Sequence, residues 1–258
     1  MESSGTYRDF LKATAWELWD GLETDQRRGV PPPAPQKPCP EAATRVDLVS
    51  PQQLTVGQMP LVEAIRRRRS RRQFTPEPLT LEELSFLLWA TQGVSGAPTE
   101  GGEPLLDDVA AHRTVPSGGG RHPFETYLLL RRVEGLAPGL YRYLPLAHQL
   151  CGLRALGQGP EERVEGAWGW RRSLRESAVI FIWTAVPYRT EWRYGVISPK
   201  IIALEAGHVC QNLYLACEAI GCGTCANVEY DQKLLDAVVD VDGESEFVVY
   251  LAPVGKVG

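Results

Sequence analysis

The sequence lacks any apolar run of about 18 residues, the length that a membrane-spanning helix requires. Its first residues, Met1–Gly5, also lack the basic and then apolar order of a secretory signal. These two absences predict a cytoplasmic protein without a membrane span. In a reducing compartment, most of the six cysteines are expected to be free thiols.

Several catalytic and metal-binding motifs are also missing. The chain has neither the G-x-S-x-G nucleophile elbow of many hydrolases nor the Walker A motif of P-loop enzymes. Four cysteines fall between Cys210 and Cys225 and include one C-x-x-C, but neither a second C-x-x-C nor a spaced histidine pair accompanies them. This C-x-x-C follows a predicted helix instead of opening one, which disfavours thioredoxin-like chemistry. We therefore expect buried thiols and no metal site.

The chain is mildly acidic overall but contains one dense run of positive charge. The net charge is −5 and the pI is about 5.5, which argues against a nucleic-acid-binding protein. Residues Arg66–Arg72 nevertheless contain six arginines and one serine. Such a run is often a solvated surface or a nucleic-acid patch, but here it lies where a short helix gives way to an extended segment. Arginines that converge there offer bidentate hydrogen bonds to a phosphate monoester, so we favour a phosphate site.

Two parts of different composition divide the chain. Residues 1–58 form an N-terminal extension, in which we expect a helix over 7–22. A proline-rich connector over 31–40 follows, and its prolines exclude a helix or a central strand. Residues 59–258 are long enough to bury the core of one domain.

The helices of this domain carry clear start and stop signals. A helix is expected over 60–69, and Thr80 begins a capping box that opens a helix ending at Gly93. The longest helix is expected from Pro199 to Ile220, followed by a short helix that Asp231 caps.

Alternating apolar patterns predict the strands. They are expected over 125–133, 139–144, 178–185 and 246–252. Residues 94–113 are expected to be a loop, and residues 154–177 are compatible with helix. The strands alternate with helices and the first two form a hairpin, so we predict an α+β fold with a mainly antiparallel central sheet flanked by helices.

Two glycine-rich segments are candidate ligand contacts. Ser117–Gly120 offers a hydroxyl and accessible backbone N–H groups, although it is also an ordinary flexible turn by composition. Gly221–Ala226 matches the G-x-G-x-x-A dinucleotide pattern, but a helix precedes it where a Rossmann site needs a strand. We interpret Gly221–Thr224 either as a helix C-cap or as a glycine turn against a flat ring.

Six segments occur in an order that resembles one family. They are R-R-S-R-R-Q-F at 68–74, P-S-G-G at 116–119, G-L-Y-R-Y at 139–143, L-E-A-G-H-V-C-Q-N-L at 204–213, G-C-G-T at 221–224 and P-V-G-K at 253–256. Together they resemble the FMN-dependent nitroreductase superfamily, with the SagB/ThcOx-type dehydrogenases as the most similar branch. The resemblance covers about residues 58–258.

The resemblance implies a nitroreductase-like fold and a homodimer with FMN at each of two sites between the subunits. The partner chain would supply the P-S-x-G loop, a glycine segment would lie against the isoalloxazine, and a late lysine would join the phosphate cluster. The residues implied for the phosphate and ribityl chain are Arg68, Arg69, Ser70 and Arg72; those of the loop are Pro116, Ser117, Gly118 and Gly119; the others are Gly221, Cys222, Gly223, Thr224 and Lys256.

One departure from the family pattern concerns the catalytic groups. Azoline oxidases of this branch carry a Lys-Tyr pair ahead of the long helix, where this chain has Arg193-Tyr194. Arginine is a poor proton shuttle, so the difference weakens an azoline-oxidase assignment and leaves Tyr194 as the candidate catalytic side chain. The alternative is that Tyr194 only packs.

The sequence thus predicts an FMN-dependent oxidoreductase that works by ping-pong hydride transfer at flavin N5. We expect NADH or NADPH as co-substrate and a nitro, quinone or similar acceptor. One alternative is a pathway dehydrogenase that oxidises a peptide-derived azoline or related heterocycle, and another is a flavin-binding scaffold subunit without catalysis. The physiological substrate is not predicted by the sequence.

Overall fold

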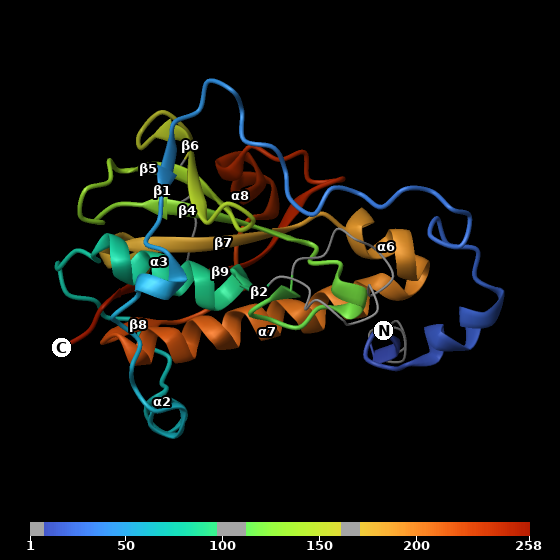
Figure 1. Ribbon diagram of the computed structural model, residues 1–258, viewed down its shortest axis with the longest axis horizontal. Helices are drawn as coiled ribbons and strands as arrows, with labels where there is room; N and C mark the ends of the chain where they lie inside the picture. Colours follow the sequence, from blue (N-terminus) through green and yellow to red (C-terminus); the bar gives the residue numbers. More distant parts are fainter. Residues whose placement is uncertain (1–7, 97–111, 161–170) are drawn as a thin grey trace, which may run out of the picture.

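The computed structural model describes residues 8–96, 112–160 and 171–258 of the chain. Its centre is a seven-stranded sheet in the order β1-β6-β5-β4-β7-β9-β8, and every neighbouring pair is antiparallel (Figure 1). These strands are β1 (Arg45–Asp47), β4 (Phe124–Leu130), β5 (Gly139–Leu144), β6 (Gln149–Ala155), β7 (Val179–Ala185), β8 (Cys222–Thr224) and β9 (Phe247–Lys256). The sheet confirms the predicted α+β class and its antiparallel character.

Helices cover both faces of this sheet. One face packs against α3 (Leu81–Gln92) and α7 (Ser198–Ala219), and the other against α5 (Arg171–Glu176) and α8 (Gln232–Val239). Within β4, alternate residues contribute to the two apolar clusters, because successive strand residues point to opposite faces. The strand is therefore buried along its whole length.

Three helix termini match their sequence signals. Thr80 Oγ1 accepts from Glu83 N at 3.1 Å and the Glu83 carboxylate accepts from Thr80 N at 2.9 Å, which completes the capping box of α3. Gly221 follows α7 with φ of 69°, a conformation that favours glycine. Asp231 caps α8 by accepting from Leu234 N at 2.9 Å.

The short helices lie at the edges of the molecule. α2 (Leu61–Arg67) projects beside α7, and α6 (Tyr188–Tyr194) lies near the N-terminal end of α7 (Figure 1). The described residues also form four 3₁₀ helices: η1 (Thr14–Gly21), η2 (Pro51–Gln53), η3 (Gly118–Gly120) and η4 (Gly195–Ile197). The helix expected over 7–22 is therefore present in part as the 3₁₀ helix η1, which has no buried residue and so lacks the packed face that stabilises an α-helix.

Three other expectations need correction. The segment 94–113, expected to be a loop, begins and ends with paired strands β2 (Val94–Gly96) and β3 (His112–Arg113), while residues 97–111 lie outside the described part. Strand β6 ends at Ala155, inside the segment 154–177 that was expected to be compatible with helix. The strand lies next to edge strand β1, and its buried and exposed residues alternate only weakly, so the sequence pattern did not indicate a strand. Of the two interpretations of Gly221–Thr224, the helix C-cap holds at Gly221, and strand β8 occupies the other three residues. Within the segment 154–177, which was expected to be compatible with helix, residues 161–170 also lie outside the described part.

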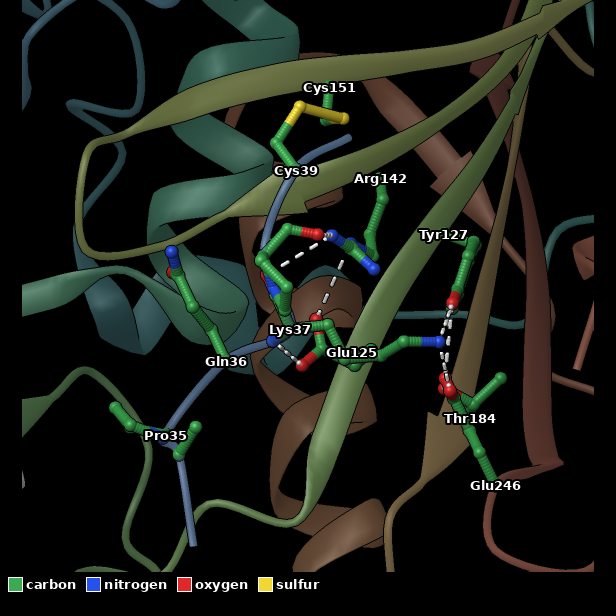
Figure 2. A network of polar contacts seen from close by, with 12 residues as sticks. Pro35, Gln36, Lys37, Cys39, Glu125, Tyr127, Arg142, Cys151, Thr184 and Glu246 are labelled. Atoms are coloured by element: carbon green, nitrogen blue, oxygen red, sulfur yellow. Dashed lines mark hydrogen bonds and ion pairs between the residues drawn. A yellow bond between two sulfur atoms is a disulfide. The ribbon is translucent and has the colours of Figure 1, made fainter. Parts of the chain in front are cut away.

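A disulfide joins the N-terminal extension to the sheet. Cys39 and Cys151 of β6 are bonded, with their Cα atoms 6.0 Å apart (Figure 2). The bond spans 112 residues of sequence, and closing a loop of this size stabilises a fold by about 4–5 kcal/mol on entropy grounds. Free thiols were thus the wrong expectation at these two positions, because the pairing follows from how the extension crosses β6. The other four cysteines are free and buried, as predicted.

Buried arginines bind the carbonyl groups of the proline-rich connector. Proline has no N–H, so the connector cannot pair as a strand, and side chains satisfy its oxygens instead. The contacts are Arg189 Nε to Ala34 O at 2.9 Å, Arg113 Nη2 to Pro35 O at 3.0 Å, and Arg142 Nη2 to Lys37 O and Pro38 O at 3.1 and 2.6 Å. The connector is therefore part of the folded structure.

Lys37 inserts its side chain into a polar network at the end of the sheet. Its backbone N–H donates to Glu125 at 2.7 Å, and its ammonium donates to Tyr127 Oη at 3.1 Å and to the Glu246 carboxylate (Figure 2). Glu246 is 6% exposed and also accepts from Thr184 Oγ1 at 2.6 Å.

Within the described ranges, no helix combines the length and apolarity needed to cross a membrane.

Candidate functional site

The arginine cluster Arg66–Arg72 begins in the last turn of α2 and continues along the free edge of β8. Arg71 N donates to Thr224 O at 2.9 Å, and Ser70 forms a parallel bridge with Thr224. Sequence segments that are far apart, 68–72 and 221–224, are thereby placed side by side. This adjacency agrees with their predicted common role.

Glu218, near the C-terminal end of α7, sets the orientation of the cluster. Its carboxylate accepts from Arg69 N at 3.2 Å and from Arg71 Nε at 3.2 Å. Arg71 is therefore neutralised internally, whereas Arg69 and Arg72 lie at the surface. Glu218 was not predicted from the sequence, although an acid in the last turn of a helix is unfavourable for the helix dipole and indicates a compensating cation.

Tyr214 supports the same cluster from one turn earlier in α7. The Arg68 guanidinium carbon lies 5.5 Å from the centroid of the Tyr214 ring, a cation–π distance. The Tyr214 hydroxyl lies 3.4 Å from Ser70 Oγ and accepts from Ala226 N at 2.9 Å. Arg68 and Ser70 are thus fixed relative to β8 before any ligand is bound.

Three residues of the predicted glycine segment, Cys222–Thr224, form the buried strand β8. A Cβ atom at Gly223 would lie 2.6 Å from Val257 Cγ1 and 2.7 Å from Arg71 Cβ, so glycine is required there by packing within the chain. Burial raises the pKa of the Cys222 thiol to about 12, which keeps it neutral. Gly223 and Cys222 thus pack within the chain, and their predicted contact with the cofactor stays a prediction.

Lys256 lies opposite Cys222 on β9, and its ammonium is paired with Glu83 of α3. Partial burial lowers the pKa of Lys256, but the hydrogen bond to Glu83 and nearby negative charge raise it more, so the net shift is upward. The cation is thus retained, but it is held by Glu83. Its contribution to a phosphate site stays a prediction.

The loop Pro116–Gly119 is built on Glu205 of α7. Ser117 Oγ donates to Glu205 Oε2 at 2.8 Å and accepts from His122 N at 2.8 Å, and Gly118 N donates to Glu205 Oε1 at 2.6 Å. The Ser117 hydroxyl, expected to face a ligand, is therefore used inside the chain. Pro116 and Gly119 are exposed and form the outer surface of the loop.

Glu205 is 4% exposed, and its carboxyl group is strongly affected by this position. Burial raises its pKa to about 7, against the opposing effect of the hydrogen bonds from Gly118 and Ser117. Glu205 was also not predicted from the sequence. The sequence pattern that could have indicated it is a carboxylate on the apolar face of the predicted helix, three residues after Ile202 and four before Val209.

Tyr194, the candidate catalytic residue, is the last residue of α6 and contacts the same loop. A Cβ atom at Gly119 would lie 2.9 Å from Tyr194 Oη and 2.7 Å from Arg193 Cδ. Gly119 also has φ of 59°, so both the space and the backbone favour glycine there. Tyr194 and the loop therefore form one structural unit.

The two groups of predicted residues do not meet within one chain. Glu218 marks the arginine cluster and Glu205 marks the loop, and at about 1.5 Å per residue these two positions on α7 are about 20 Å apart. Figure 1 shows α2 and β8 near one end of α7 and α6 near the other. A groove of about 1300 Å³ between α6, α7 and β9 is lined by none of the predicted site residues.

Among the described residues, no three histidine, cysteine or acidic side chains gather as metal ligands.

The sequence comparisons agree with the fold. The profile of the nitroreductase family matches residues 65–256. The chain is 30% identical over 202 residues to "Putative nitroreductase MJ1384" of Methanocaldococcus jannaschii, covering 78% of this chain and 93% of that protein. It is also 25% identical over 183 residues to "Trifolitoxin-processing protein TfxB" of Rhizobium leguminosarum bv. trifolii, covering 68% of this chain and 48% of that protein.

Two solved structures show the same fold. A "putative nitroreductase" from Ralstonia eutropha JMP134 has a TM-score of 0.66 and 26% identity, over 88% of this chain and 97% of the other. A chain of the E. coli microcin synthetase McbBCD complex has a TM-score of 0.58 over 96% of this chain and 82% of the other, and its 17% identity supports likeness of fold alone. The profile match and the archaeal relative each cover most of the chain, so this protein belongs to the nitroreductase family.

Proposed function

We propose that this family member is an FMN-dependent oxidoreductase that takes hydride from NADH or NADPH and passes it to a nitro, quinone or similar acceptor in a ping-pong cycle. The observation that carries the proposal is the arginine cluster fixed along β8 by Glu218 and Tyr214. When bound, FMN supplies the redox chemistry, and the protein supplies binding and orientation.

The residues present fit the phosphate of FMN. Arg68, Arg69 and Arg72 surround Ser70 in sequence, and guanidinium groups donate two hydrogen bonds to one phosphate. Arg71 is paired with Glu218, so its role is to hold the segment in place. The predicted contributions of Gly221, Thr224 and Lys256 stay part of this proposal through their positions on or beside β8.

The distance between the cluster and the loop supports a homodimer. We infer that Pro116, Ser117, Gly118 and Gly119 complete the cofactor site of the partner chain across a two-fold axis. Large apolar side chains are exposed on the two helices that carry the half-sites: Leu61, Val62 and Ile65 of α2 and Leu204 of α7 are 58–64% exposed. Ala64 is the one buried residue of α2, so this helix needs a partner surface to be packed.

Mixed dimers test this sharing of residues. One chain carries Arg68→Ala with Arg72→Ala, and the other carries Gly119→Val, which the positive φ disfavours. Each variant homodimer should bind little FMN, whereas the isolated mixed dimer keeps one intact site and should hold about half an FMN per chain. A mixed dimer without FMN, or a Gly119→Val homodimer with full FMN, would contradict the shared site.

A second candidate function is oxidation of a peptide-derived azoline or related heterocycle. It is supported by the 25% identity to a trifolitoxin-processing protein, of which this chain spans about half. Against it stands Arg193 where azoline oxidases of the similar branch have lysine. Rapid bleaching of bound flavin by NADH or NADPH favours the reductase, and flavin reduction by an azoline peptide alone favours the second function. FMN content separates both from a scaffold role without flavin.

A further inference from the structure

Tyr194 lies between the Pro116–Gly119 loop and two tryptophans of the N-terminal extension. On one side its hydroxyl is close to Gly119, as described above. On the other side its ring centroid is 6.2 Å from that of Trp16 in an edge-on arrangement and 5.9 Å from that of Trp19 in a tilted one. The extension therefore reaches the region in which we place the substrate side of the partner's flavin.

This part of the extension is fixed to α6. Trp192 Nε1 donates to Val30 O at 2.8 Å, and Gln26 N donates to Trp192 O at 2.9 Å. Tyr188 Oη donates to Asp25 at 2.7 Å. Because these contacts hold both ends of α6, the extension and the helix that carries Tyr194 keep a constant relative position.

Trp19 is also held on its second side. The Arg27 guanidinium carbon lies 4.5 Å from the Trp19 centroid, and Arg27 Nη1 donates to the carbonyls of Trp19 and Leu22 at 2.7 and 2.8 Å. Trp16, in contrast, is 45% exposed although it contacts both Trp19 and Tyr194. The three rings thus form a preformed wall with one large open aromatic surface.

We propose that Trp16 and Trp19 are specificity-determining residues that select planar aromatic substrates by stacking beside Tyr194 at the partner's flavin. This inference rests on the proposed function, because it uses the loop as the marker of the flavin site. Aromatic rings prefer offset or edge-on contacts with other rings, and a rigid wall favours flat molecules over puckered ones of similar size. The extension would therefore determine which substrates the site accepts, while the arginine cluster holds the cofactor.

A pair of matched probes tests the wall without turnover. Benzoate and cyclohexanecarboxylate carry the same charge and differ in planarity, and their dissociation constants are measured on the FMN-loaded dimer from the change in flavin absorbance. The wild-type protein should prefer benzoate. Trp16→Ala and Trp19→Ala should each reduce this preference by about fivefold, and Trp19→Phe should restore most of it. Leu18→Ala, an exposed residue between the two tryptophans, is the control and should leave the preference unchanged.

The outcomes separate the two proposals. Flavin-loaded Trp16→Ala and Trp19→Phe proteins report on the wall even where Trp19→Ala fails to fold. An unchanged preference in Trp16→Ala and Trp19→Ala proteins that keep full FMN and normal reduction by NADH or NADPH would overturn this inference and spare the proposed function. A wild-type protein that binds no FMN would overturn both.

Discussion

The Ser117 hydroxyl donates a 2.8 Å hydrogen bond to the carboxylate of Glu205, which is buried at the base of the exposed loop. The same carboxylate accepts from Gly118 N. One buried acid in the middle of α7 thus determines the conformation of a loop that we assign to the partner's cofactor site. Its protonation state affects both stability and loop geometry.

We expect Glu205→Gln to change how stability depends on pH. Burial raises the folded-state pKa to about 7 from an ordinary value of 4.5, so the folded protein holds a proton there that the unfolded chain has released. Stability from this group therefore falls as pH rises from about 4.5 to 7, by an amount on the order of 3 kcal/mol. Glu205→Gln should remove this fall, which urea unfolding at several pH values measures.

An exposed acid serves as the control for this prediction. Glu41→Gln should leave the pH dependence of the unfolding free energy as in the wild-type protein, since Glu41 lies at the surface. The same pH profile for the wild-type and Glu205→Gln proteins would show that Glu205 does not titrate in this range.

Removing two arginines should weaken FMN binding without unfolding the protein. Charge-assisted hydrogen bonds contribute about 1.5–3 kcal/mol each, so Arg68→Ala with Arg72→Ala should raise the dissociation constant for FMN about 100-fold or more. Arg66→Ala is the matched control, because Arg66 pairs with Glu63 on the surface of α2. Flavin fluorescence titration measures all three proteins. Full retention of FMN by the double variant would place the phosphate elsewhere.

The ion pair of half-buried Lys37 with buried Glu246 should contribute more to stability than a fully exposed pair. Lys37→Met leaves a carboxylate that is 6% exposed without its cation, which costs about 3 kcal/mol or more. Adding Glu246→Gln removes the unpaired charge and should recover most of this loss. The control is Lys12→Met, which breaks an exposed pair with Asp9 and should cost less than about 1 kcal/mol. Equal losses in urea unfolding would argue against the network of Figure 2.

Tyr194→Phe separates a catalytic phenol from a packing residue. The variant keeps the ring against Trp16 and Trp19 and removes the hydroxyl beside Gly119. If the hydroxyl moves a proton for the substrate, the substrate half-reaction should slow about tenfold or more, while flavin reduction by NADH or NADPH is unchanged. Tyr141→Phe, which removes a hydroxyl that donates to Ala137 O away from this region, is the control. Unchanged single-turnover rates in both half-reactions would leave Tyr194 with a packing role.

Local signals in the sequence predicted much of the fold, and long-range contacts explain what they missed. The capping box at Thr80 and the cap at Asp231 depend on neighbouring residues, so they could be read directly. The disulfide of Cys39 and Cys151 depends on where the extension crosses β6. No local pattern encodes that path.

In the candidate site, too, local features could be predicted from the sequence and long-range contacts could not. The arginine run was visible by composition, but the sequence alone did not show that Arg71 pairs with Glu218. The sequence also did not show that the Ser117 hydroxyl donates to Glu205; its contact with a ligand stays a prediction. Tyr194 was chosen by resemblance, and its contact with Trp16 and Trp19 required the position of an extension that no motif describes.

The central claim is that this chain binds FMN and uses it for hydride transfer. The most direct measurement is an anaerobic titration of the purified protein, first with FMN and then with NADH or NADPH, followed by visible absorbance. The account predicts about one FMN per chain in a dimer, with bleaching of the flavin band as reduced nicotinamide is added. A protein that stays colourless after incubation with excess FMN would contradict the account.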